Sequence, residues 1–194
     1  MKSRITIRRT LLCGLVGAAT AGWIGGAAAQ TRSFSFAYDQ PNTTAYGIAA
    51  NIFDAKLKEL SGGRMNINQF PGAQLGQEPQ MLQKMRAGDI DFVITSTANA
   101  STLAPQAGVF SLHFIFRDQN HLTMVLADPA ISAAFRDMVK ESVQGAQVIG
   151  LLTMGLRNMY SKKEIKSVAD VKGQKVRVQA TKTEDTHFPA YGAQ

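Results

Sequence analysis

The sequence predicts an α/β fold built around a parallel sheet. Stretches with strand-like alternation and stretches with helical spacing of apolar residues follow one another along the first hundred residues. Glycines and prolines separate these stretches, and residues 90–95 form a short apolar run with β-branched side chains. Strands connected through helices run parallel, and the crossovers place helices on both faces of the sheet.

The first predicted strand and helix lie between residues 33 and 60. Residues 33–38 alternate Ser and Phe, which is typical of a strand. Apolar residues then recur at helical spacing over residues 41–60, with Thr43 or Thr44 as the N-cap and Gly62-Gly63 as the stop.

The next three elements are a strand, a helix and a strand. Residues 65–70 alternate again and predict the second strand. After the turn at Pro71-Gly72, a short helix is expected between Gly76 and Gly88. Residues 90–95 then predict a third strand, buried on both faces.

The remaining elements are less regular. Residues 98–116 contain Pro105 and Gly108 and have no assigned element. Further along we expect helices over 118–127 and 129–143, strands over 148–154, 157–161 and 175–179, a short helix with a capping box at 167–170, and a helix from Thr183 that Pro189 kinks or ends.

A change of composition near Gly155 predicts a domain boundary. Residues 30–154 form the first α/β domain, and residues 155–194 begin a second one. Because about 40 residues rarely build an independent core, we expect the second domain to be incomplete.

The first 29 residues have the features of an export signal. Four basic residues come before the apolar run from Leu11 to Gly26, and Ala27-Ala28-Ala29 is a cleavage site. A membrane anchor is the alternative, since the run approaches the ~20 residues that span a bilayer. We expect cleavage near Ala29, a mature chain that does not span the membrane, and a periplasmic location.

Charge and residue type exclude several classes of function. Four of the 21 basic residues lie in the first 29 residues, which contain no acid, so the rest carries 17 basic and 14 acidic residues. These are scattered, which argues against nucleic-acid binding. The single cysteine, Cys13, lies in the signal, and the three histidines lack metal-ligand spacing. No catalytic motif is present, so we expect no enzyme, no metal and no cofactor.

Three places could bind a solute at the carboxyl ends of the strands. Ser96, Thr97 and Asn99 follow the third strand, either as hydrogen-bonding groups for a ligand or only as a helix cap and polar loop. Arg157 lies at the domain crossing, and Arg177 lies in the middle of the predicted strand 175–179, where a central strand would desolvate it at least partly. A guanidinium binds a carboxylate bidentately, although the pattern alone favours a structural ion pair or a hydrated arginine.

Four motifs carry a resemblance to the solute-binding subunits of TRAP transporters, the DctP-like family. Residues 70–76 resemble its "fPxxqLG" turn and residues 82–93 its "l-x-x-G-x-x-D" element. Residues 155–158 resemble "G-x-R-n", and residues 170–178 resemble "D-l-K-G-x-K-i-R-v". His113 stands where the family usually has proline, and residues 181–189 are more polar than its usual helix.

The resemblance implies a two-domain periplasmic-binding-protein-like (type II) fold that binds a small organic acid and delivers it to integral-membrane TRAP permease subunits. It implies that Arg177 clamps the ligand carboxylate, that Arg157 assists, and that Ser96 and Asn158 are further ligand contacts. Family members continue beyond the point where this sequence stops, so we expect a C-terminally truncated chain. A binding protein of an ABC transporter or receptor, an exported α/β enzyme and a nonfunctional fragment remain alternatives.

Overall fold

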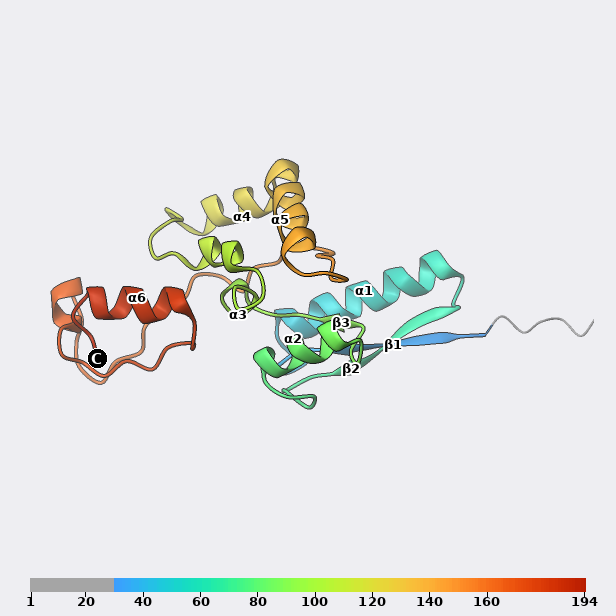
Figure 1. Ribbon diagram of the computed structural model, residues 1–194, viewed down its shortest axis with the longest axis horizontal. Coiled ribbons are helices and arrows are strands. Elements are labelled where there is room, and N and C mark those ends of the chain that lie inside the picture. The colour runs from blue at the N-terminus through green and yellow to red at the C-terminus, as the bar shows by residue number, and fades with distance from the viewer. Residues whose placement is uncertain (1–29) are drawn as a thin grey trace, which may run out of the picture.

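The computed structural model describes residues 30–194, and the predicted signal peptide lies outside these residues (Figure 1). Its helices and strands in chain order are β1 (Arg32–Ala37), α1 (Ala45–Ser61), β2 (Met65–Phe70), α2 (Glu78–Ala87), β3 (Phe92–Val93), α3 (Thr97–Ala100), the 3-10 helix η1 (Pro105–Ser111), α4 (Gln119–Ala127), α5 (Pro129–Ser142), the 3-10 helix η2 (Val168–Val171) and α6 (Lys182–Ala190).

The described sheet is parallel, with the strand order β2-β1-β3. Phe34 of β1 is in register with Ile67 of β2, and Phe36 with Phe92 of β3. The strands, the helices that connect them and the parallel direction were predicted from the sequence. The third strand is shorter than predicted, because only residues 92–93 of the 90–95 run pair with β1, and it forms an edge of this sheet.

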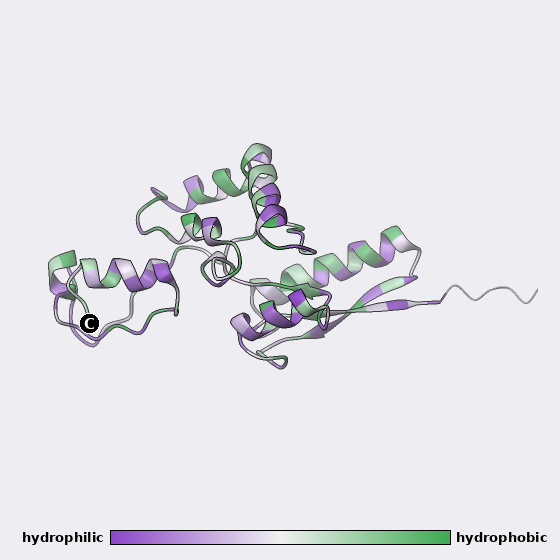
Figure 2. Ribbon diagram, in the orientation of Figure 1, coloured by the Kyte–Doolittle hydropathy of each residue, from purple (hydrophilic) through white to green (hydrophobic). Residues whose placement is uncertain are grey.

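Helices cover both faces of the sheet, as predicted. On one face, α1 packs against Phe36, Tyr38 and Ile67 through Tyr46 and Ala50. The opposite face carries a second cluster, in which Ala37 meets Met81 of α2 and Ile90. Figure 2 shows that α1 carries both apolar and polar residues, as a helix with one buried face does.

Helix α1 begins and ends where the sequence predicts. Thr44 is its N-cap residue, and Gly62 adopts a left-handed conformation at its C-cap with φ of 60°. Only glycine adopts this conformation without strain, which explains the stop. Asp54 joins the helix to β2, since its Oδ1 accepts a hydrogen bond from the backbone N–H of Ile67 at 2.9 Å.

Helices α3, η1, α4 and α5 form a separate helical layer beside the sheet (Figure 1). Its core consists of Ala104, Ala107, Phe135, Val139 and Val143. The boundaries of α4 and α5 agree with the predicted 118–127 and 129–143 within one residue. Asp118 and Asp128 cap the two helices by accepting hydrogen bonds from backbone N–H groups.

The three strands predicted after residue 147 are wrong. Residues 148–154, 157–161 and 175–179 form no strand among the described residues. A strand requires a hydrogen-bonded neighbour, and residues 148–154 and 157–161 make no backbone hydrogen bond to another segment of the described chain. Beside 175–179, the Val176 N–H donates to the Gln194 carbonyl at 3.1 Å and the Gln194 N–H to the Gln174 carbonyl at 2.8 Å, which is too short a pairing to form a strand. The predicted capping box of Ser167 and Asp170 is confirmed, although the helix that it caps is a 3-10 helix. The predicted helix that Pro189 kinks or ends is α6, which ends one residue after this proline.

Candidate ligand-binding site

The polar run after β3 is organised by one buried carboxylate. Oε2 of Glu78, from the first turn of α2, accepts hydrogen bonds from the Thr95 hydroxyl (2.9 Å), the Ser96 N–H (2.9 Å), the Ser96 hydroxyl (2.7 Å) and the Asn99 amide (2.6 Å). Only 4% of Glu78 is exposed. Ser96 is also the N-cap of α3, accepting from the Asn99 N–H at 3.2 Å. Ser96 is therefore at the strand end, as predicted, and acts as a helix cap.

The Glu78 charge contributes to raised pKa values of two further side chains, Asp39 and Tyr46. Burial first and the Glu78 carboxylate second raise the pKa of Asp39, in the loop after β1. Burial, Glu78 and Asp39 also raise the pKa of Tyr46 in α1, whereas the positive charge of Arg157 lowers it. The charges of Asp39, Glu78 and Arg157 therefore all act on Tyr46, whose hydroxyl can donate a hydrogen bond.

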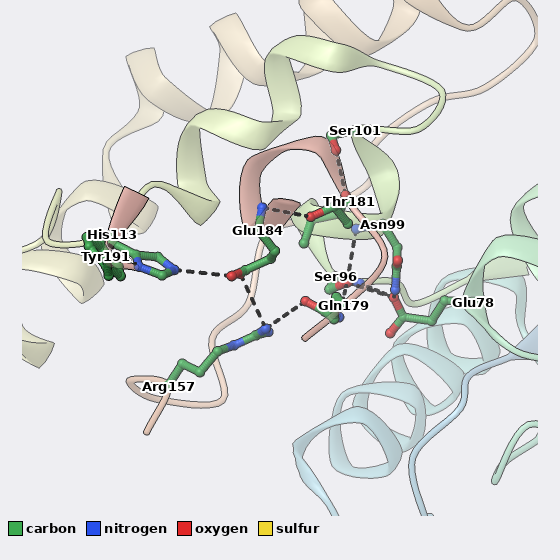
Figure 3. Close-up of polar contacts among 11 residues, drawn as sticks. Glu78, Ser96, Asn99, Ser101, His113, Arg157, Gln179, Thr181, Glu184 and Tyr191 are labelled. Atoms are coloured by element: carbon green, nitrogen blue, oxygen red, sulfur yellow. Dashed lines mark hydrogen bonds and ion pairs between the residues drawn. The ribbon is translucent and has the colours of Figure 1, made fainter. Parts of the chain in front are cut away.

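Arg157 contacts side chains of the C-terminal segment (Figure 3). Its Nη1 donates a hydrogen bond to Oε1 of Gln179 at 2.7 Å and lies 3.9 Å from Oε1 of Glu184. Gln179 in turn donates through Nε2 to the Ser96 hydroxyl oxygen at 3.3 Å. The side chain of Arg157 remains 63% exposed, so the guanidinium is accessible to a solute.

Glu184 connects Arg157 to His113. The Glu184 side chain is only 5% exposed, and its Oε2 lies 3.2 Å from Nε2 of His113. Nδ1 of His113 lies 3.0 Å from the Tyr191 hydroxyl. The Glu184 N–H is capped by the Thr181 hydroxyl at 3.5 Å. His113, which stands where the family usually has proline, therefore connects the loop after η1 to α6 and the residue that follows it.

Arg177 differs from the sequence prediction in its surroundings. It is exposed rather than desolvated, because its segment forms no strand among residues 30–194 and is joined through its backbone only to the C-terminal residues, where the Val176 N–H donates to the Gln194 carbonyl at 3.1 Å. Its neighbours Val176 and Val178 are half-buried, so the alternation expected of a strand is present. No carboxylate of the described residues lies within 4.0 Å of its guanidinium.

Among the predicted residues, the structure links Ser96 to Arg157 through Gln179. Asn158 is exposed, and its amide donates to the Leu156 carbonyl at 3.3 Å. Neither Asn158 nor Arg177 has a hydrogen bond to this network in the described chain. The contacts of Glu78, Gln179 and Glu184 were not predicted from the sequence. Glu78 and Glu184 differ from the other acidic residues in being buried. The spacing of residues along the sequence does not reveal this burial.

The described residues contain no group of three or more His, Cys, Asp or Glu side chains able to hold a metal ion. A hollow of about 420 Å³ lies elsewhere, lined by Arg86, Leu103, Ser142, Val143 and Gln144. It contains none of the predicted site residues. The polar network around Ser96 and Arg157 remains the candidate site.

Comparison with protein families gives a match over residues 36–194 to DctP, described as bacterial extracellular solute-binding protein, family 7. The chain belongs to this family. Curated relatives include the C4-dicarboxylate-binding protein DctB of Bacillus subtilis, 27% identical over 82% of this chain and 45% of the relative. The 2,3-diketo-L-gulonate-binding periplasmic protein YiaO of Escherichia coli is 29% identical over 84% of this chain and 49% of the relative. The chain spans about half the length of these relatives.

Solved structures of the DctP family support the fold. A TRAP periplasmic solute binding protein from Xanthobacter autotrophicus Py2, with bound β-D-galacturonate, has a TM-score of 0.77 and 27% identity over 83% of this chain and 53% of that one. The sugar acid binding protein DctPAm of Advenella mimigardefordensis, in complex with galactonate, has a TM-score of 0.76 and 27% identity over 84% of this chain and 52% of that one. The periplasmic-binding-protein-like (type II) fold is thereby confirmed, with about half of it present in this chain.

Within residues 30–194, no helix is both long and apolar enough to cross a bilayer.

Proposed function

We propose that this protein is the extracytoplasmic solute-binding subunit of a TRAP transporter, which captures a small organic acid and delivers it to integral-membrane permease subunits. Arg177 clamps the ligand carboxylate, and Arg157 assists it. Asn158 contributes a polar contact, and Ser96 contributes through the hydrogen bonds that it makes with Glu78 and Gln179. The observation that carries the proposal is the Arg177 guanidinium, which has no carboxylate of the described chain within 4.0 Å. An arginine without an internal partner retains its full capacity for a bidentate bond to an anion.

The surroundings of Arg157 also support the binding of a carboxylate ligand. The nearest carboxylate oxygen to Arg157, on Glu184, is 3.9 Å away, which is longer than a hydrogen bond. The guanidinium is instead held by the neutral Gln179 amide at 2.7 Å. Arg157 therefore keeps donors for a ligand, and a carboxylate that meets both arginines is held more strongly than by either alone.

A sugar acid is the ligand class that we favour. The relatives from Xanthobacter autotrophicus and Advenella mimigardefordensis hold galacturonate and galactonate. Beside the Glu78 network, the half-buried Asp39 carboxyl can accept hydrogen bonds from the hydroxyl groups of such a ligand. We propose that residues 30–154 form the first domain, that residues 155–194 belong to the second, and that closure around the acid excludes water.

The remaining parts of the proposal concern export. We propose that residues 1–29 are a signal peptide cleaved near Ala29 and that the mature protein acts in the periplasm. The composition of this segment supports the proposal, with Lys2, Arg4, Arg8 and Arg9 ahead of an apolar run and small residues at the cleavage site. Mass spectrometry of the exported protein checks the cleavage position.

Titration calorimetry with D-glucuronate, D-galacturonate and succinate tests the binding function, with D-glucose as the uncharged control. We expect at least one acid to bind and D-glucose not to bind, because the proposed anchor is the carboxylate. Binding of D-glucose with the affinity of D-glucuronate would contradict the arginine clamp. Absence of binding to every organic acid in a thermal-shift screen would contradict the function itself.

A further inference from the structure

We propose that Gln179 is a positioning residue of the acid-binding site, whose amide holds the Arg157 guanidinium against the strand end at Ser96. This inference rests on the proposed function, in which Arg157 assists the carboxylate clamp. The Gln179 amide uses both of its ends: Oε1 accepts from Nη1 of Arg157 at 2.7 Å, and Nε2 donates to the Ser96 oxygen at 3.3 Å (Figure 3).

The chemistry of the neighbours fixes the orientation of the amide. Arg157 offers only donors, so the Gln179 atom facing it must be the oxygen. The Ser96 hydroxyl gives its single proton to the Glu78 carboxylate at 2.7 Å, so its oxygen is left to accept from the Gln179 nitrogen. A chain of hydrogen bonds therefore runs from Arg157 to Glu78 with one consistent direction, and reversing the amide would break two of its bonds.

A neutral residue is the suitable partner for this arginine. Fixing a free arginine side chain costs rotamer entropy, and a partner that fixes it before the ligand arrives reduces the cost of binding. A carboxylate at position 179 would also fix Arg157 but would neutralise the charge that a visiting acid needs. The amide orients the guanidinium without placing a second carboxylate beside it, in addition to that of Glu184 at 3.9 Å.

The hydrogen bonds of the Gln179 amide join the two proposed domains, residues 30–154 and 155–194. Ser96 belongs to the first proposed domain, at the N-cap of α3, whereas Gln179 and Arg157 both follow residue 155. Gln179 lies two residues after Arg177 on the same extended segment. The amide therefore couples the position of Arg157 to the segment that carries Arg177.

Two substitutions separate positioning from charge. Gln179→Met has similar length but makes no hydrogen bond, so Arg157 loses its support and D-glucuronate affinity should fall about 5- to 10-fold, the equivalent of one hydrogen bond. Gln179→Glu keeps the shape but neutralises Arg157, so the affinity should fall further, by about 50-fold or more. Gln174→Met is the matched control, because Gln174 lies on the same segment and contacts Ser161 and the Asp170 carbonyl instead.

Calorimetry in an Arg157→Ala background supplies the decisive readout. There, Gln179→Met should cost less than about 2-fold, because the residue that it positions is gone, whereas a purely structural role would cost the same in both backgrounds. Unchanged affinity in both Gln179 variants, equal losses in the two backgrounds, or tighter binding by Gln179→Glu than by Gln179→Met would each overturn the inference. If the unsubstituted protein binds no organic acid, the proposed function fails, and this inference fails with it.

Discussion

Replacing Glu78 by alanine tests whether one carboxylate oxygen organises the strand end of the candidate site. Four donors from Thr95, Ser96 and Asn99 converge on Oε2 of Glu78, which is 4% exposed. A hydrogen bond to a charged group contributes ~1.5–3 kcal/mol. The side-chain donors can turn toward water, so we count the loss of about two such bonds and expect a decrease of about 3–6 kcal/mol in the free energy of unfolding.

Urea unfolding followed by circular dichroism measures this decrease. Glu59→Ala is the matched control, since Glu59 is a helix residue whose exposed ion pair with Lys56 should contribute less than about 1 kcal/mol. A Glu78→Ala protein within 1 kcal/mol of the unsubstituted one, on the scale of a single weak bond, would refute the role assigned to this carboxylate.

The same residue should control the titration of Asp39. Glu78→Gln removes the neighbouring negative charge, so the pKa of Asp39 should fall toward its ordinary value while burial, the larger cause, keeps it partly raised. A carboxyl-carbon NMR titration measures the shift. An unchanged pKa would show that the two side chains do not interact.

Three further predictions concern binding, acid sensitivity and the core. Arg177→Ala should cost about 2–5 kcal/mol of D-glucuronate binding by calorimetry, the range for removing one member of a charge pair, and an unchanged affinity would contradict the clamp. The hydrogen bond from Lys58 holds the pKa of Asp54 low, so Asp54 stabilises the fold above about pH 4 and loses this effect as the pH falls through its folded-state pKa. Asp54→Asn should therefore flatten the acid side of a plot of melting temperature against pH, and an identical curve would refute the pairing. Met81→Ala should lower the free energy of unfolding by about 2–5 kcal/mol, since this side chain is 0% exposed, and a loss below 1 kcal/mol in urea unfolding would contradict its burial.

The first half of the fold could be predicted because its signals are local. The alternation over residues 65–70 and the glycines at 62 and 88 fix a strand and two helix ends through backbone geometry alone. The strands predicted over 148–154 and 175–179 have the same local pattern but form no ladder. Pairing depends on a neighbouring segment, which no local pattern supplies, and Ile149, Leu152 and Met154 consequently remain exposed.

The candidate site shows the same division between local and long-range information. Ser96 and Arg157 could be found because they follow recognisable strand-like runs. Gln179 and Glu184 could not, because their roles arise from contacts with residues 22 to 83 positions away, such as Gln179 with Arg157 and with Ser96. The expectation that Arg177 is desolvated failed with the strand on which it depended.

A crystal structure of the protein with bound D-glucuronate tests the central claim most directly. The account predicts the ligand carboxylate within hydrogen-bond distance, about 2.7–3.1 Å, of the Arg177 guanidinium, with Arg157 nearby and still joined to Gln179. A ligand whose carboxylate lies away from both arginines, with Arg177 paired to an acid of the protein, would contradict it.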